Sequence, residues 1–309
     1  MDNKLILVVV IVVVIVVIVW FLYRQTNHPH QVEAKWYKPQ DIIRQHREIK
    51  VDLLPFERNG NQLNVHTAAD LTTNSAQAGS TNWAGYVAAN SLANPTQNSV
   101  SNVVGTFVVP SLVPTSGQNN DNVSIWVGID GAFGTDPTVQ QIGIDLSYEN
   151  DTTVAYAWFE MYPQPAYEIS GFPIRAGDSI TVSVSHSNTS RTNFNQTGVY
   201  TLKMVNNTER VQVTIPTSYT QNARARGQSA EWIVEAPSLG PDVVALSPFR
   251  PAVQWTNCSA TIGTGSGSTG PISRFPNVEV TMGTPTQVKA QPTVLNSAGT
   301  SFGVAWVHT

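Results

Sequence analysis

Period-two hydrophobic alternation, interrupted by clusters of Gly, Pro, Asn and Ser, constrains the fold of this chain more than any other feature. Ile180, Val182 and Val184 alternate with polar residues, and a continuous helical period longer than a turn or two is missing beyond residue 80. Further β-rich runs cover residues 101–110, 123–129, 199–205, 210–215, 230–234, 278–282 and 302–307. Many short strands separated by turn residues indicate an all-β sandwich or barrel.

The N-terminal segment has a different pattern. Residues 5–22 are all apolar, mostly Val and Ile, and Lys4 and Arg24 flank them. Eighteen residues at about 1.5 Å rise span roughly 27 Å, close to the hydrocarbon thickness of a bilayer. A cleaved signal peptide has a shorter apolar run and a small-residue cleavage site, and none follows here. We therefore expect residues 1–4 to be a short tail and 5–22 to be an uncleaved transmembrane anchor.

Basic residues are concentrated in the segment 23–79, between the anchor and the β-rich region 80–309. Seven Lys or Arg residues lie between 24 and 58, whereas the whole of 80–309 holds nine. The segment could be a stalk, with a short helix over 40–54 and a polar linker over 59–81. It could equally be a basic propeptide that covers an acidic cleft until it is removed.

Membrane orientation does not follow from charge, because more basic residues follow the apolar run than precede it. Low charge and six Asn-x-Ser/Thr sequons favour an external, glycosylated domain. The sequons begin at Asn122, Asn150, Asn188, Asn195, Asn206 and Asn257. We expect a monomeric single-pass protein of the cell membrane with its β region on the extracellular side.

Composition excludes several classes of function. Charged residues are 12% of the chain and the net charge is −4, so a basic surface for nucleic acid is lacking. The single cysteine, Cys258, excludes an internal disulfide and a multi-cysteine metal site, and we expect it to be buried. GxSxG, HExxH and P-loop motifs are absent, and only His186 and His308 lie in the β region. We expect no metal and no organic cofactor, which leaves carboxylates as the acid–base groups.

Acidic and amide side chains interrupt the apolar β runs in four segments, three of them beside tryptophans. These segments are WVGIDG (126–131), QIGID (141–145), WFEMYP (158–163) and EWIVE (231–235). Residues two apart on a strand point to the same face. Gln141 therefore shares a face with Asp145, and Glu231 with Glu235. Interleaved aromatic residues indicate a substrate groove on a free concave face rather than a solvated sheet surface.

These segments, with NWAGY at 82–86, resemble in type and order the glutamic peptidases (eqolisins, family G1, formerly A4), whose best-known members are secreted fungal acid proteases. The likeness covers about 80–260, with a further strand at 301–307. It implies an antiparallel sandwich of two seven-stranded sheets, of the concanavalin-like or jelly-roll type. The anchor is unlike the secreted fungal members and fits a prokaryotic surface protein.

The resemblance also implies the catalytic pair. Gln141 matches the family glutamine and Glu231 the family glutamate, with Glu235 as the alternative. A glutamate of near-normal pKa can activate water as general base and return the proton to the leaving amine, while the glutamine amide stabilises the oxyanion. Such a base predicts an acid endopeptidase acting on polypeptides. The expected groove-lining and supporting residues are Trp83, Trp126, Asp130, Asp145, Trp158, Glu160, Tyr162 and Glu235.

Some residues depart from the family pattern. Ile142, Phe159 and Met161 stand where fungal members have other residues, and the fungal disulfides are absent, which puts the subsite preference in doubt. A glycan-binding or glycan-cleaving sandwich remains an alternative, with Glu160 and Glu231 as a carboxylate pair. A third alternative is a non-catalytic adhesion domain. Gln141 separates these alternatives, because only the peptidase needs it.

Overall fold

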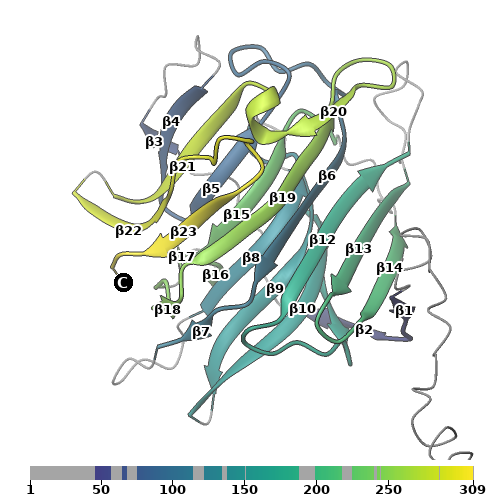
Figure 1. The fold of residues 1–309 in the computed structure, drawn as a ribbon, viewed down its shortest axis with the longest axis vertical. Coiled ribbons are helices and arrows are strands. Elements are labelled where there is room, and N and C mark those ends of the chain that lie inside the picture. The colour runs from purple at the N-terminus through teal and green to yellow at the C-terminus, as the bar shows by residue number, and fades with distance from the viewer. Residues whose placement is uncertain are drawn as a thin grey trace, which may run out of the picture. The chain divides into compact units, whose positions relative to one another are not determined.

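Strands make up almost all of the regular structure that the computed structural model describes, as the alternation predicted (Figure 1). The described residues are 46–56, 65–67, 75–113, 122–133, 138–149, 151–187, 199–217, 225–239, 242–243, 245–284 and 286–308. All of them belong to one unit, His46–Thr309. None of the described elements is a helix long and apolar enough to cross a membrane, and the expected anchor at 5–22 lies outside the described residues.

The first layer is a sheet of neighbouring strands that carries the WVGIDG, QIGID, WFEMYP and EWIVE segments at its centre. In spatial order its strands are β2 (Asp52–Phe56), β11 (Ala166–Ser170), β10 (Thr152–Tyr162), β9 (Val139–Glu149), β8 (Asn122–Ile129), β15 (Ala230–Glu235), β5 (Trp83–Ala88), β21 (Asn277–Thr284), β4 (Ser75–Ser80) and β3 (Val65–Thr67).

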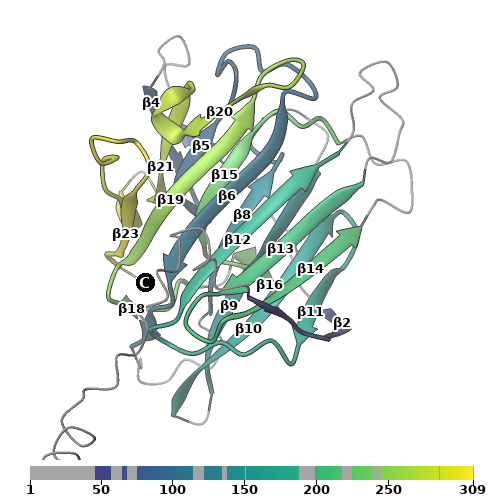
Figure 2. The same cartoon turned by 45° about the vertical axis from the view of Figure 1, so that its right-hand side comes forward.

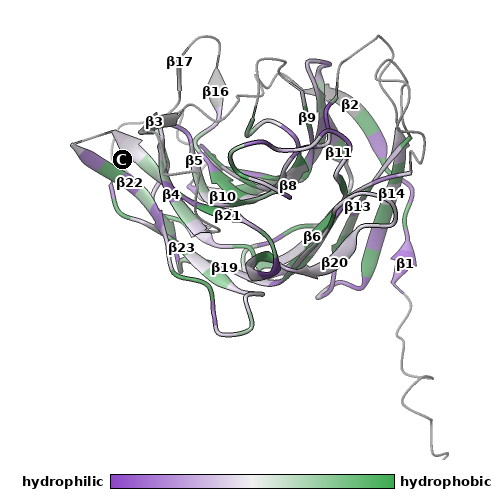
Figure 3. Ribbon diagram, turned by 90° about the horizontal axis from the view of Figure 1, so that it is seen from above, coloured by the Kyte–Doolittle hydropathy of each residue, from purple (hydrophilic) through white to green (hydrophobic). Residues whose placement is uncertain are grey.

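The second layer covers one face of the first, as the view from above shows (Figure 3). Its strands are β1 (Arg47–Glu48), β14 (Val211–Thr217), β13 (Tyr200–Asn206), β12 (Ser179–His186), β6 (Val100–Val108), β19 (Val253–Ile262), β20 (Ser268–Pro271), β23 (Phe302–Trp306) and β22 (Gln287–Pro292). The remaining elements are the pairs β7 (Ser111–Leu112) with β18 (Phe249–Arg250) and β16 (Ser238–Leu239) with β17 (Asp242–Val243), and the 3-10 helix η2 (Ile272–Arg274).

The expectation of two seven-stranded antiparallel sheets is wrong in strand number, since the two described layers contain ten and nine strands, and in two further details. Strand β22 pairs with β21 of the first layer and β23 of the second, so hydrogen bonding runs continuously from one layer into the other. A register shift between Met282 and Gly283 accompanies the β21–β22 pairing, as expected where a sheet bends. Two pairings, β1 with β14 and β4 with β21, are parallel.

The main hydrophobic core lies between the two layers. In β12, Ile180, Val182 and Val184 are fully buried and alternate with half-buried polar residues, which confirms the predicted alternation. Strands β8 and β15 are buried on both faces, and this explains their nearly continuous apolar sequences. A second cluster, containing Trp83, Trp126 and Trp158, covers the opposite face of the first layer. Cys258 is buried in the main core, as expected.

The segment before residue 80 contributes strands to both layers. Strand β1 pairs with β14 and β2 pairs with β11, so residues 47–48 and 52–56 form strands where a short helix was expected over 40–54. Residues 40–45 of that expected helix lie outside the described residues. Figure 2 shows β2 beside β11. Strands β3 and β4 extend the opposite edge of the first layer. The described fold therefore includes strands that the sequence assigned to a stalk or propeptide.

Candidate active site

The pairing register places the catalytic candidates in one row across four neighbouring strands. Glu231 of β15 pairs with Gly128 of β8, Gly128 pairs with Gln141 of β9, and Gln141 pairs with Glu160 of β10. At an ordinary strand spacing of about 4.8 Å, the Cα atoms of Glu231 and Gln141 are about 10 Å apart. Their side chains point to the same face, and the residue between them has no side chain of its own.

Adjacent rows on this face carry the predicted supporting residues. One row contains Ile233, Trp126, Gly143 and Trp158. The next contains Trp83, Glu235, Ser124, Asp145 and Tyr156. Beyond the other side of the catalytic row, Tyr162 pairs with Val139, and Asp130 follows the end of β8. The structure thus gathers all ten predicted site residues on or beside one face: Trp83, Trp126, Asp130, Gln141, Asp145, Trp158, Glu160, Tyr162, Glu231 and Glu235.

Hydrogen bonds orient several of these side chains. Gln141 Nε2 donates to Glu160 Oε2 at 2.7 Å, which fixes the direction of the amide. Trp126 Nε1 donates to Glu235 Oε2 at 2.8 Å, and the Ser124 hydroxyl donates to Asp145. Glu235 lies two rows from Gln141 and accepts a hydrogen bond from the Trp126 indole, whereas Glu231 lies in the same row as Gln141, so the geometry favours Glu231 over Glu235 as the partner of Gln141.

The site face is buried, so the expectation of a free concave face is wrong. Glu231 has 0% and Gln141 1% of its surface exposed. Both carboxylate oxygens of Glu231, and Oε1 of Gln141, have no hydrogen-bond partner among the described residues. Buried acceptors without partners are costly, and water or a ligand commonly satisfies them. These three atoms stand on either side of Gly128 and mark a place for a polar molecule between them.

Burial raises the pKa of Glu231 well above its ordinary value, and the charge of Asp130 raises it further. Ser229, two residues back on the same face, lowers the pKa, although its hydroxyl makes no hydrogen bond of good geometry to a described residue. The expectation of a glutamate with near-normal pKa is therefore wrong. Desolvation keeps this carboxyl protonated to higher pH than an exposed glutamate.

The carboxylate of Asp130 holds the segment that leads into β15 through hydrogen bonds. This carboxylate accepts hydrogen bonds from the backbone N–H groups of Arg226 (2.7 Å), Gly227 (2.8 Å) and Gln228 (2.9 Å), and from the Thr138 hydroxyl (3.3 Å). Burial raises the pKa of Asp130, and these hydrogen bonds offset part of that rise. Asp130 therefore holds the start of the strand on which Glu231 lies.

Two glycines that the sequence analysis did not single out shape this face of the sheet. A Cβ added to Gly128 would lie 2.8 Å from Trp126 Cζ3, and one added to Gly143 would lie 2.2 Å from the Ile125 carbonyl oxygen. The signal was available, because a glycine inside a strand often marks a close approach of other groups. Both positions need glycine so that the Trp126 side chain can lie against the sheet.

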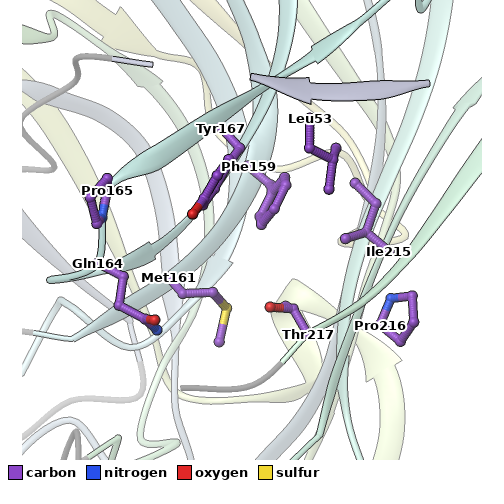
Figure 4. A pocket seen from close by; sticks show the side chains of 9 residues that line it. All are labelled: Leu53, Phe159, Met161, Gln164, Pro165, Tyr167, Ile215, Pro216 and Thr217. Atoms are coloured by element: carbon purple, nitrogen blue, oxygen red, sulfur yellow. The ribbon is translucent and has the colours of Figure 1, made fainter. Parts of the chain in front are cut away.

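The departures from the family pattern lie on the opposite face. Ile142 is fully buried in the main core, and Phe159 and Met161 line a cavity of about 310 Å³ between β10, β11 and β14 (Figure 4). Leu53 of β2 and Tyr167, which stacks on Phe159, also line it. These residues point away from the row of Glu231 and Gln141, so they do not contact a substrate held there.

The fold and site define a class of β-sandwich protein with a buried glutamate–glutamine pair on one sheet face. Residues 81–302 match the model of the Peptidase A4 family, and the chain belongs to this family. The solved scytalido-glutamic peptidase with a transition state analog inhibitor superposes with a TM-score of 0.59 at 23% identity, over 74% of this chain and 98% of that one. The aspergilloglutamic peptidase of Aspergillus niger gives a TM-score of 0.50 at 30% identity, over 60% of this chain and 99% of that one.

The chain is also similar in sequence to two fungal proteins. Aspergillopepsin-2 of Aspergillus niger is 32% identical over 205 residues, which is 60% of this chain. Scytalidopepsin B of Scytalidium lignicola is 32% identical over 165 residues, which is 52% of this chain. The matched parts span 65% and 58% of the lengths of these two proteins.

Proposed function

We propose that this protein is an acid endopeptidase in which Glu231 and Gln141 hydrolyse peptide bonds with water as the nucleophile. The observation that carries the proposal is the row of Glu231, Gly128 and Gln141, with three buried polar atoms left without described partners on either side of the glycine. A water molecule between these side chains, and the N–H groups of a bound peptide, would donate the missing hydrogen bonds. Membership of a peptidase family supports the same chemistry.

The geometry supports a different role for each side chain of the pair. Gln141 has two amide hydrogens, and only one is used by Glu160, so the other can donate to the oxyanion that forms when water attacks the carbonyl carbon. A donor of this kind contributes on the order of 10²–10³ in rate. Glu231 exchanges protons with the water and with the leaving nitrogen.

The raised pKa of Glu231 indicates how the cycle begins in acid. As water attacks, a protonated Glu231 carboxyl can donate its proton to the carbonyl oxygen, which also accepts the hydrogen bond from the Gln141 amide, while the other carboxyl oxygen accepts a proton from the water. The water oxygen then bonds to the carbonyl carbon, and a later proton transfer to nitrogen releases the amine. Activity should therefore fall as the pH rises through the raised pKa of Glu231.

The glycosidase alternative is less well supported by the register. Glu160 and Glu231 are separated by three strand spacings, about 14 Å between Cα atoms. Paired glycosidase carboxyl groups stand roughly 5–9.5 Å apart. Glu160 also accepts the hydrogen bond from Gln141, so its carboxylate is engaged within the row. It serves better as an orienting group for the amide than as an acid or nucleophile.

Digestion of denatured casein by the full-length chain in detergent tests the proposal. We expect internal cleavage that is strongest in acid, insensitive to pepstatin and to chelators, and lost in Glu231→Gln. The full chain is needed because strands β1 and β2 belong to the described fold. A folded protein that cleaves nothing between pH 2 and 7, with or without processing of residues 23–79, would move the assignment to a glycan-binding sandwich.

We also propose that residues 5–22 anchor the peptidase to the cell membrane, with the catalytic region outside. The uninterrupted apolar run of these residues supports this proposal. Added protease should digest residues 80–309 on intact cells and leave the anchor in the membrane fraction. Protection of that region until the cells are opened would contradict the orientation.

A further inference from the structure

We infer that Glu235 is a positioning residue, which sets the spacing of the catalytic pair by holding the indole of Trp126 above Gly128. The inference rests on the proposed function of Glu231 and Gln141 and assigns to Glu235 a role apart from proton transfer. It follows from the contacts on each side of the Trp126 ring.

Trp126 lies in the row next to the catalytic row, and its ring extends over Gly128. A Cβ on Gly128 would be 2.8 Å from Trp126 Cζ3 and 3.3 Å from Cε3. Ordinary carbon–carbon contacts are about 3.5–4.0 Å, so the ring lies against the backbone itself. Gly128 pairs with both Glu231 and Gln141. The indole therefore forms the floor of the space between the carboxyl and the amide.

Three contacts fix this ring. Gly143 lies beneath the Trp126 side chain, where a Cβ would be 2.5 Å from Trp126 Cβ. Trp83 packs against the ring edge to face, with centroids 4.9 Å apart and an interplanar angle of 79°. Glu235 Oε2 accepts the indole N–H at 2.8 Å. The hydrogen bond is the contact with the strictest requirement for direction, so it fixes the side-chain torsion angles that determine where the ring lies.

Rotation of the ring would change the space available to both catalytic side chains. Trp126 and Glu235 are both essentially buried, so their hydrogen bond does not exchange readily with solvent. Displacement of catalytic groups by about 1 Å can lower the rate about 100-fold. Loss of the hydrogen bond should therefore lower kcat and leave KM nearly unchanged, because substrate binding does not need the N–H.

A double-mutant cycle tests the inference in the full-length protein. We expect Glu235→Leu and Trp126→Phe each to lower kcat about 10- to 100-fold. The kcat of the double variant should lie within about threefold of the kcat of the less active single variant. Glu235→Gln keeps an acceptor oxygen and should recover most of kcat. Equal losses in Glu235→Gln and Glu235→Leu, or additive losses in the cycle, would overturn the positioning role.

A matched control separates positioning from stability. Trp232 donates its indole N–H to the Val104 carbonyl oxygen at the same distance, 2.8 Å, on the core face of β15. Trp232→Phe removes an equivalent hydrogen bond and should lower the melting temperature about as much as Trp126→Phe, with kcat largely kept. If Trp232→Phe loses as much kcat as Trp126→Phe, then loss of any indole hydrogen bond made with β15 lowers kcat, and the positioning role of Glu235 is overturned.

The indole ¹⁵N–¹H resonance of Trp126 gives a readout that does not depend on activity. This resonance, identified by its disappearance in Trp126→Phe, should move in Glu235→Leu and remain near its original position in Glu235→Gln. An unmoved resonance in Glu235→Leu overturns the inference. A wild-type protein that shows the expected shifts but has no peptidase activity would instead refute the proposed function and leave the contact established.

Discussion

Gly128→Ala adds one methyl group at the centre of the catalytic row. The new Cβ would lie 2.8 Å from Trp126 Cζ3, whereas carbon atoms in contact stand about 3.5–4.0 Å apart, so the ring or the strand must shift by about 0.7–1.2 Å. Trp126 is fully buried and hydrogen-bonded to Glu235, so it has little freedom to move. Overpacking of this kind costs about 1–3 kcal/mol.

The same displacement should reduce activity much more than it reduces the folded population. A shift near 1 Å between the groups that hold the reacting atoms lowers kcat about 100-fold. The assay is kcat and KM for peptide cleavage in acid, measured beside the urea unfolding midpoint. We expect kcat to fall at a temperature at which the urea unfolding curve shows the variant to be fully folded in the absence of urea.

Gly105→Ala is the matched control for this prediction. Its Cβ would lie 2.8 Å from both Trp232 Cδ1 and Trp255 Cζ3, in the main core and away from the catalytic row. Its stability loss should be similar or larger, with kcat largely kept. The reasoning fails if Gly128→Ala retains wild-type kcat, or if the two variants lose kcat equally.

Two further predictions concern the buried carboxyl groups. Asp130→Asn sets an NH₂ group against at least one backbone N–H and should cost about 1–3 kcal/mol in urea unfolding with a loss of kcat. Asp178→Ala, which removes the acceptor of the hydrogen bonds from Arg175 N–H and Asn206 Nδ2, should lose stability alone, and a kcat loss equal to that of Asp130→Asn would contradict this. Burial raises the pKa of Glu231 above the ordinary 4.5, so the folded state holds this proton more tightly than the unfolded chain, and stability is lost as the pH rises through the raised pKa. Glu231→Gln should therefore be more stable than wild type at pH 7 and similar to it at pH 3, and a lower melting temperature at pH 7 would contradict this sign.

Alternation in the sequence predicted the strands well where one face is exposed. Strand β12 is an example, because its polar residues face outward from the second layer. Strands β8 and β15 were recognised by their apolar content, although burial on both faces removes the alternation. The strands at 47–56 were missed, because they pair with strands more than 100 residues away and carry no strong local pattern.

The choice of Gln141 and Glu231 as candidates rests on the resemblance to the glutamic peptidases, and the strand period adds only which residues share a face. Gln141 with Asp145, and Glu231 with Glu235, were placed on common faces by the period of two alone. The row that joins Glu231 to Gln141 was not predictable, since it depends on the register between three strands. Burial of the face, and hence the raised pKa of Glu231, also required the packed structure.

The most direct test of the account is kcat/KM for one internally quenched peptide, measured from pH 2 to 7 in wild type, Glu231→Gln, Gln141→Ala and the double variant. We predict that wild-type activity falls as the pH rises, that each single variant loses at least about 10²-fold, and that the double variant loses little more, because the two side chains act as a unit. Wild-type activity in Gln141→Ala, or an unchanged pH profile in Glu231→Gln, would contradict the central claim.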